Sequence, residues 1–274
     1  MKPKSESPVR YVGHGDPRST LDLLWGNVPE TRRGPRRGLT TRAVGAAALQ
    51  LADQGGLAAL SMRNLGAQLG VAAMALYRYV PTKDVLLELV LEAAYAELPD
   101  VLPMRATWPE QLRIVATDAW DLYLAHPWML QISVQRPSLG PHAIRKYERE
   151  LKSIERAGLP DVEMDMVIAT VSDFVRGCAR SASEAASASE ATGLSDPDWW
   201  EAHAQHLARL VTPEQFPLAV RVGSAAGEAY GAATDPRRTF EFGLERLISG
   251  VVLHVQGNPP SRRRQSRLGV GRLR

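Results

Sequence analysis

Apolar residues recur every three to four positions through most of the chain, which is the spacing of amphipathic helices. The pattern is continuous from residue 40 to about residue 98 and returns in longer segments up to residue 256. Alanine and leucine are abundant while aromatic residues make up only 6% of the chain, so helices are favoured over strands. The pattern therefore predicts an all-α protein.

The first part of this pattern predicts four helices, of which the second and third are short. The first helix begins at Thr40 and Gly55-Gly56 ends it, while Ser61 is a good N-cap for the second and Gly70 closes it. Pro81 stops the third helix, and a longer fourth helix follows. The predicted ranges are 40–54, 61–69, 72–79 and 82 onward. Together they form a compact three-helix unit with a connecting helix.

The rest of the chain is also predicted to be helical up to residue 256. The strongest segments end at breaks such as His126-Pro127 and Gly158. Residues 192–238 are interrupted by Gly and Pro, and only one helix is predicted there. The predicted ranges are 108–125, 127–134, 142–157, 162–191, 199–211 and 238–256.

The two ends of the chain lack this pattern. Residues 1–38 are rich in Pro, Gly and charge and are predicted to be a disordered arm, with an apolar cluster at 21–26 that could dock as a short turn. Residues 258–274 are predicted to be a disordered Arg-rich tail. This leaves an N-terminal domain at 39–98 and a larger domain at 99–257.

The distribution of charge agrees with this division. The ends contribute +4 and +6 to a total of only +3, so residues 39–257 carry a net charge of −7. Basic ends on an acidic body suit contact with an anionic polymer such as DNA, although Arg-rich ends also aid solubility. One hypothesis is that the basic stretch 32–37 follows the minor groove of bound DNA.

Residues 61–80 have the pattern of a helix-turn-helix, whose second helix lies in the major groove of DNA. Such a motif needs apolar inner faces, a small residue at the turn and polar or aromatic residues facing out. Gly70 and Val71 supply the turn. The predicted inner faces consist of Leu65, Ala67 and Leu69, then Leu76 and Val80. The predicted outward residues are Arg63, Ala73, Met74, Tyr77 and Arg78.

The literal sequence of this region resembles the N-terminal domain of the TetR family of bacterial repressors. The segment GLAALSMRNLGAQLGVAAMALYRYVPTKDVLLELV carries the resemblance, most specifically at 59–63, 69–71, 76–80 and 83–87. Weaker similarity to the C-terminal domain of the tetracycline-repressor-like branch is found at 126–128, 136–137 and 240–244. The resemblance implies a regulator, most simply a repressor, that binds double-stranded operator DNA as a homodimer.

The resemblance also implies which side chains meet DNA. Arg63 is best suited to bind guanine through two hydrogen bonds, and Met74 with Ala75 would contact thymine methyl groups. Tyr77, Tyr79 and Lys83 would hold phosphates, unless one tyrosine packs mainly into the core. The full predicted set is Thr40, Thr41, Arg42, Ser61, Arg63, Ala73, Met74, Ala75, Tyr77, Arg78, Tyr79 and Lys83.

For the larger domain, the resemblance implies a dimer interface and a pocket for a small-molecule effector. The helices at 162–190 and 238–256 are apolar over a wide face, so we predict that they form the interface. The candidate pocket residues are Trp128, Met129, Ile132, Tyr147, Asp173, Phe174 and Arg176. Tetracycline-binding members use a histidine and a glutamate where this chain has Ile132 and Ser181, so recognition of a magnesium-chelated tetracycline is not expected.

Other classes of protein fit the sequence less well. Motifs of hydrolases, nucleotide-binding enzymes and zinc proteases are missing, and no cofactor is expected. His203 and His206 share a helix face near Glu201, but without a third ligand we expect no metal site. A DNA-compacting protein would be basic throughout, but the body of this chain is net negative. Whether the regulator is a repressor or an activator stays open. The single Cys178 is predicted to be a core residue, and the lack of a long apolar run predicts a cytoplasmic protein without a membrane span.

Overall fold

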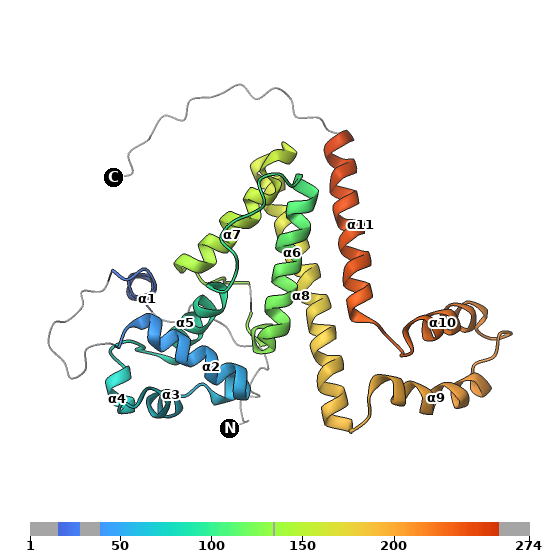
Figure 1. Ribbon diagram of the computed structural model, residues 1–274, viewed down its shortest axis with the longest axis horizontal. Helices are drawn as coiled ribbons and strands as arrows, with labels where there is room; N and C mark the ends of the chain where they lie inside the picture. Colours follow the sequence, from blue (N-terminus) through green and yellow to red (C-terminus); the bar gives the residue numbers. More distant parts are fainter. Residues whose placement is uncertain (1–15, 28–38, 134, 258–274) are drawn as a thin grey trace, which may run out of the picture.

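The computed structural model describes residues 16–27, 39–133 and 135–257, which fold as helices and connecting turns without a strand (Figure 1). The all-α prediction is therefore confirmed for this part of the chain. The elements are α1 (Pro17–Leu24), α2 (Thr41–Ala59), α3 (Met62–Leu69), α4 (Ala73–Leu76), α5 (Lys83–Tyr95), α6 (Trp108–Ala125), η1 (Pro127–Gln131), α7 (Pro141–Ile154), η2 (Glu155–Ala157), α8 (Asp161–Thr192), α9 (Asp196–Leu210), α10 (Pro217–Tyr230) and α11 (Pro236–Gly257).

Local capping chemistry fixes where the N-terminal helices begin. The side-chain oxygens of Thr40, Ser61 and Thr82 accept hydrogen bonds from backbone N–H groups three residues further on, at 3.1 to 3.2 Å. Each bond satisfies a donor that the first turn of a helix leaves without a partner. Within α2, Gly55 and Gly56 leave helical geometry, and Gly56 has a φ of 63°. The predicted break at these two glycines is thus present.

Helices α2 to α4 form a reading head that α5 joins to the rest of the molecule (Figure 1). Helix α5 is buried along most of its length because it packs on α2 on one side and on α7 on the other. The larger domain consists mainly of α6, α7, α8 and α11. Its core contains the ring of Trp120, which stacks on Phe240 at 4.4 Å between centroids. We call this larger domain the sensor domain.

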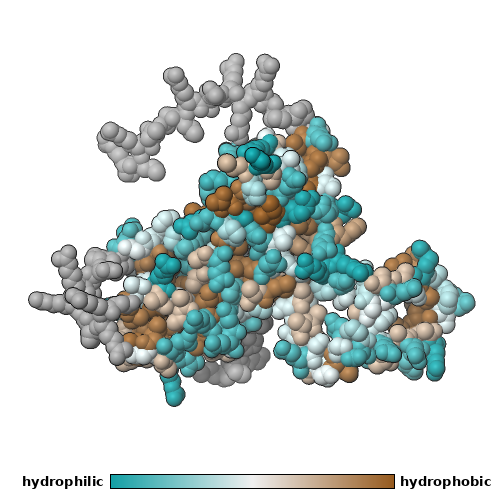
Figure 2. Space-filling view, viewed as in Figure 1, coloured by the Kyte–Doolittle hydropathy of each residue, from teal (hydrophilic) through white to brown (hydrophobic). Residues whose placement is uncertain are grey.

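Helices α9 and α10 form an arm that extends away from the other helices (Figure 1). Figure 2 shows apolar patches on this arm, and seven of its large apolar residues are exposed. They are Trp199, Leu207, Leu210, Phe216, Leu218, Val222 and Tyr230.

Helix α10 is the main element that the sequence pattern does not predict. Its glycines resemble helix breakers, but Gly227 lies inside the helix and is buried. A Cβ atom at Gly227 would lie 2.7 Å from the ring of Trp200 on α9. This glycine therefore permits close packing between the two helices and does not end the second one.

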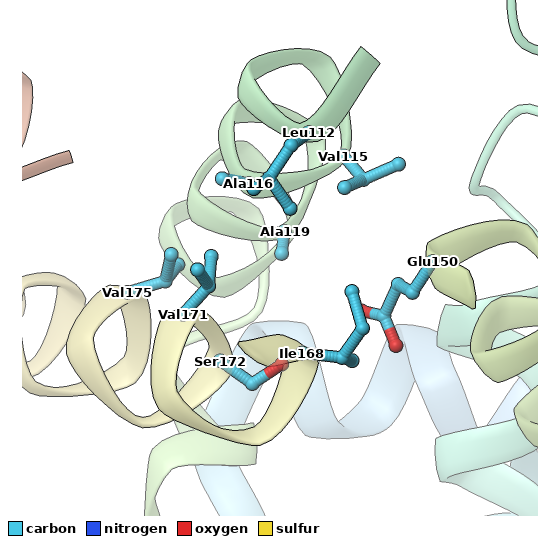
Figure 3. A pocket seen from close by; sticks show the side chains of 9 residues that line it. All are labelled: Leu112, Val115, Ala116, Ala119, Glu150, Ile168, Val171, Ser172 and Val175. Atoms are coloured by element: carbon cyan, nitrogen blue, oxygen red, sulfur yellow. The ribbon is translucent and has the colours of Figure 1, made fainter. Parts of the chain in front are cut away.

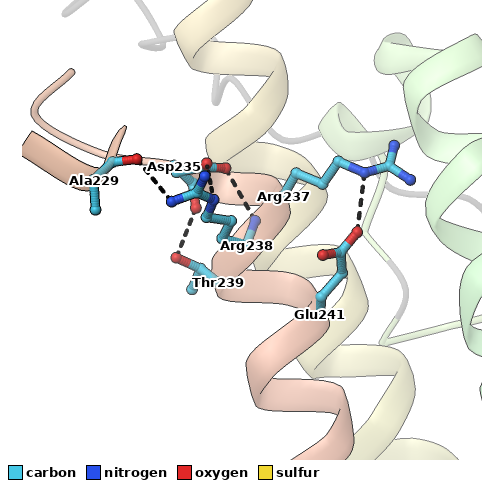
Figure 4. A network of polar contacts seen from close by, with 6 residues as sticks. All are labelled: Ala229, Asp235, Arg237, Arg238, Thr239 and Glu241. Atoms are coloured by element: carbon cyan, nitrogen blue, oxygen red, sulfur yellow. Dashed lines mark hydrogen bonds and ion pairs between the residues drawn. The ribbon is translucent and has the colours of Figure 1, made fainter. Parts of the chain in front are cut away.

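A polar network at the first turn of α11 ties this helix to the end of α10 (Figure 4). The Nη1 atom of Arg238 donates to the carbonyl oxygen of Ala229 at 2.8 Å, and its Nε atom lies 3.2 Å from Asp235. The hydroxyl of Thr239 donates to the backbone carbonyl of Asp235 at 2.9 Å. These bonds attach the arm to α11 in addition to the chain itself.

Helix α1 corrects the prediction that residues 1–38 form a disordered arm. Asp16 caps the helix, Pro17 occupies its first position, and Leu23 is buried. The indole N–H of Trp25 donates to the carbonyl oxygen of Leu139 at 3.0 Å. This apolar cluster therefore docks as a helix, not as a short turn. The basic stretch 32–37 and the tail 258–274 lie outside the described residues.

Other boundaries differ by a few residues from the predicted ones. Helix α4 ends at Leu76, three residues before the predicted end, while η1 ends at Gln131 and is followed by extended backbone at Ile132. The helix predicted at 142–157 is divided into α7 and η2, and Gly158 with φ of 75° closes it as predicted. No helix in the described part of the chain combines the length and apolar character that a membrane crossing requires.

Candidate nucleic-acid interface and effector cavity

The turn between α3 and α4 depends on two glycines. Gly70 caps α3 in the left-handed region with φ of 64°, a conformation that costs glycine little. At Gly66 a Cβ atom would lie 2.8 Å from the carbonyl oxygen of Val71. The backbone N–H of Val71 also donates a hydrogen bond to the carbonyl oxygen of Gly66. The two helices can therefore meet at the steep angle of a helix-turn-helix.

The inner faces of α3 and α4 are packed into the head. Leu65, Leu76 and Val80 are fully buried, and Leu69 is half-buried. Ala67, which we predicted for the inner face, is exposed, so that assignment is wrong. Its place is taken by Gly66, which is buried against the turn.

The opposite face of the motif carries most of the predicted DNA-binding residues. The side chains of Met74 and Tyr77, which lie one turn apart on this face, are 78% and 46% exposed. The exposed members of the set are Thr40, Arg42, Arg63, Met74, Ala75, Tyr77, Arg78 and Lys83. The half-buried members are Thr41, Ser61, Ala73 and Tyr79.

The two tyrosines are in different environments. Tyr79 packs against the core of the head, whereas Tyr77 projects from it. Tyr77 is therefore the better placed of the two to reach a phosphate. The Ser61 oxygen caps α3 by accepting from the N–H of Asn64, which leaves its O–H group free to donate to a DNA phosphate.

Three of the seven predicted effector residues lie together around a small open cavity of about 30 Å³. Met129, Ile132 and Arg176 line it with residues of α5 and of the 133–138 segment. The other members of its lining are Leu91, Tyr95, Ser133, Pro137 and Ser138. The cavity is thus mainly apolar, with one guanidinium and no carboxylate in its wall.

The remaining predicted effector residues lie elsewhere. Trp128 is buried, and its indole N–H donates to Asp53 of α2 at 2.8 Å. Tyr147 is exposed and donates to Asp165 at 2.7 Å, and Asp173 is exposed as well. Phe174 stacks near Phe240 in the core of the sensor domain.

Arg176 organises one wall of the cavity. Its Nη2 atom donates to the backbone carbonyls of residues 129, 130 and 132, the bond to Leu130 being 3.0 Å long. Its guanidinium also lies over the ring of Tyr123 at 5.6 Å. These contacts hold the end of η1 against α8.

A second, smaller cavity of about 10 Å³ lies between α6 and α8 (Figure 3). Its wall is aliphatic except for Ser172 and Glu150. Glu150 forms a buried ion pair with Lys146 at 2.5 Å. Burial lowers the pKa of Lys146, but the charge of Glu150, the nearby Tyr123 and Tyr95 and the hydrogen bond to Glu150 together outweigh burial and raise this pKa. Burial raises the pKa of the nearby Tyr95 phenol well above its ordinary range.

Two carboxylates that the sequence does not single out join the head to the sensor domain. Asp53 of α2 accepts hydrogen bonds from Trp128 and contacts His126, and Glu92 of α5 accepts from the first backbone N–H groups of α7. The partners are 50 to 75 residues apart in sequence. No local pattern could have found them.

The residues weighed as metal ligands do not assemble a site. His203 stacks on Trp199 at 4.2 Å, and its Nδ1 atom lies 2.6 Å from the carbonyl oxygen of that residue. Residues 16–27, 39–133 and 135–257 contain no group of three or more His, Cys, Asp or Glu that could hold a metal ion. Ile132 is buried and offers no ligand atom where tetracycline-binding proteins have a histidine.

An exposed helix-turn-helix on a small head, joined to a larger helical domain with a cavity, defines a DNA-binding transcriptional regulator. The family model of bacterial regulatory proteins of the tetR family matches residues 45–90, and that of the tetracyclin repressor-like C-terminal domain matches residues 99–254. The chain therefore belongs to the TetR family.

Individual relatives agree with this assignment. The HTH-type transcriptional repressor DrrR1 of Streptomyces coeruleorubidus is 37% identical over 249 residues, which cover 89% of this chain and 88% of DrrR1. Among solved structures, apo ActR from Streptomyces coelicolor is 27% identical with a TM-score of 0.66 over 81% of this chain and 99% of ActR. The structure of ActR in complex with actinorhodin is 28% identical, with a TM-score of 0.65 over 80% of this chain and 99% of ActR.

Proposed function

We propose that this protein represses transcription as a homodimer that binds operator DNA through α3 and α4 and is released by a small-molecule effector. The observation that carries the proposal is the exposed outer face of α4, where Met74 and Tyr77 project from a head whose inner residues are fully buried. The name of the relative DrrR1 supports the repressor assignment over the activator alternative.

The exposed residues suit different parts of a duplex. Arg63, at the start of α3, provides the two-pronged donor that guanine accepts, and Met74 provides an apolar contact for thymine. Tyr77 and Lys83 provide donors for phosphates, and Lys83 begins α5, where the helix dipole also favours anions. Specificity then depends on a few base contacts and on DNA shape.

The proposed dimer interface is formed by α8 and α11. These helices pack on each other, yet each retains exposed large apolar residues. On α8 they are Val162 and Met166, and on α11 they are Phe242 and Leu253. A second copy of the chain would cover them, and two heads would then face successive turns of the major groove.

The proposed effector site is the cavity of about 30 Å³, which an organic effector would have to widen. Its wall includes Leu91 and Tyr95 of α5, the helix that leads to the head, so an occupant would bear on the connection between the domains. The lining favours an apolar organic molecule that accepts a hydrogen bond. The complex of ActR with actinorhodin supports an organic ring compound as the type of ligand.

Binding of the purified protein to a duplex from its own upstream intergenic region tests this proposal. Specific sites are usually bound roughly 10³ to 10⁷ times more tightly than scrambled DNA. Arg63→Ala combined with Tyr77→Ala should abolish this preference. Lys152→Ala, which removes a cation from the exposed end of α7, is the matched control and should leave it unchanged.

Three results would contradict the proposal. Equal binding to all duplexes would favour the DNA-compacting alternative, and loss of reporter transcription on deletion of the gene would favour an activator. A Phe242→Glu variant that elutes with the same mass as the wild type, both monomeric, would exclude the proposed dimer.

A further inference from the structure

A histidine with almost no exposed surface lies where the head meets the sensor domain. The Nδ1 atom of His126 lies 2.7 Å from a carboxylate oxygen of Asp53, and its Nε2 atom lies 3.0 Å from a carboxylate oxygen of Glu97. The His126 side chain is only 6% exposed. One imidazole thus bridges two acids from different parts of the chain.

The three residues belong to three different segments, which this bridge joins. Asp53 lies on α2 of the head, two residues before the break at Gly55, and Glu97 lies just beyond the end of α5. His126 ends α6 and precedes η1 in the sensor domain. Because Trp128 donates to the same oxygen of Asp53, two side chains of the sensor domain hold one carboxylate of the head.

We propose that His126 is a positioning residue for DNA binding, which in its doubly protonated form ties Asp53 to Glu97 and so fixes the angle of the reading head on the sensor domain. The proposal rests on the DNA-binding function proposed above. It assigns to this cluster of one buried histidine and two partly exposed carboxylates a role in presenting the two heads to successive major grooves.

The chemistry of imidazole makes this contact depend on pH. The imidazolium has two N–H donors and can donate to both carboxylates, whereas neutral imidazole has one. After loss of a proton, one carboxylate would face a nitrogen lone pair and the bridge would open on that side. The indole N–H of Trp128 would keep Asp53 partly held.

The surroundings keep the proton on His126. Burial lowers the pKa of His126, but hydrogen bonds to Asp53 and Glu97 together with their charges outweigh it and raise the pKa above its ordinary value. On α8, which packs on η1, Arg176 and Arg180 are engaged with backbone carbonyls of residues 129–132. The contribution of the bridge is therefore fully present below the ordinary imidazole pKa and is lost as the pH rises through the raised one.

Operator affinity measured between about pH 6 and pH 9 at fixed ionic strength tests the proposal. We expect the wild type to bind about tenfold more weakly at the upper end, the change expected from one charge-assisted hydrogen bond. His126→Gln and Asp53→Asn should bind at the weaker level throughout and lose this pH dependence. His203→Gln, which removes an exposed histidine, should keep the wild-type profile.

Glu97→Gln keeps the test valid if His126→Gln fails to fold. Glu97 is half-exposed, so its substitution leaves the packing intact, and it should remove most of the pH dependence. A His126→Gln or Glu97→Gln variant that binds with the wild-type pH profile would overturn the proposal.

A readout without DNA separates this proposal from the DNA-binding function. The His126 ring protons followed by NMR should titrate above the ordinary imidazole range, and Asp53→Asn should lower that pKa. A normal titration that Asp53→Asn does not change would overturn the bridge even if the operator is bound. The expected titration in a protein that binds no operator would instead refute the proposed function.

Discussion

Glu92 offers a direct test of how the connecting helix is held to the sensor domain. Its buried carboxylate accepts hydrogen bonds from the backbone N–H groups of His142 and Ala143, at 2.7 and 3.0 Å. These are the second and third residues of α7, whose own N-cap, Gly140, has no side chain to offer. Glu92 therefore caps a helix 50 residues away and faces the positive end of its dipole.

The contacts set the size of the expected effect. Glu92→Ala leaves two N–H groups without a protein partner, and water can reach them only in part because both residues are half-buried. A lost cap costs typically about 1 kcal/mol and a buried donor without a partner about 1–3 kcal/mol. We expect the free energy of unfolding to fall by about 2–3 kcal/mol, a change of roughly 4–12 °C in Tm. Glu92→Gln keeps one acceptor oxygen and should lose about half as much.

Urea unfolding followed by circular dichroism at one protein concentration measures this loss. Concentration must be fixed because mass action would stabilise the proposed dimer. Glu148→Ala, on the exposed side of α7, removes only a surface ion pair with Lys152 and should cost less than about 1 kcal/mol. If Glu92→Ala and Glu148→Ala unfold at the same urea concentration, the argument that Glu92 caps α7 is refuted.

Three further predictions follow from local packing. Gly227→Ala should loosen the arm and make it more sensitive to limited proteolysis, because a Cβ atom there would lie 2.7 Å from the Trp200 ring. Gly223→Ala is the control, because open space surrounds this position, and it should stabilise α10 by up to about 1 kcal/mol. Leu65→Ala should lower the free energy of unfolding by about 2–5 kcal/mol in a chemical denaturation, since Leu65 is fully buried in the head. Burial raises the pKa of the Cys178 thiol, so a thiol reagent at pH 8 should modify it more slowly than free cysteine; equal rates would contradict this.

The reading head could be predicted from sequence because short-range chemistry specifies it. Thr40, Ser61 and Thr82 cap helices through bonds to residues three positions away, and Gly70 adopts a backbone conformation that few other residues tolerate. These signals involve residues within about one helical turn of each other, so they can be recognised in the sequence. The misplacement of Ala67 has the same origin, because helical spacing alone does not show that Gly66 is the residue pressed against the turn.

The sensor domain was less predictable because distant residues define it. In the sequence Gly227 resembles a helix breaker, because only the structure shows that the ring of Trp200 occupies the space beside it. Residues 17–24 read as part of a disordered arm until Trp25 is seen to bind the carbonyl of Leu139. Of the cavity proposed as the effector site, the sequence pattern names only Met129, Ile132 and Arg176, since the rest of the wall comes from α5 and from Ser133, Pro137 and Ser138.

The positions of Glu92 and Glu97 suggest why α5 is suited to carry a signal. The two carboxylates lie on either side of Tyr95, which lines the cavity, and each is held by the sensor domain: Glu92 by the start of α7, and Glu97 by His126. An effector larger than the cavity has to displace part of its wall, which comes from α5, from the end of η1, from Arg176 of α8 and from Ser133, Pro137 and Ser138. If α5 is the part that moves, the contact of Glu92 or of Glu97 must lengthen, and the head attached to α5 changes its angle. By linkage, operator DNA that favours the original angle must weaken effector binding by the same factor.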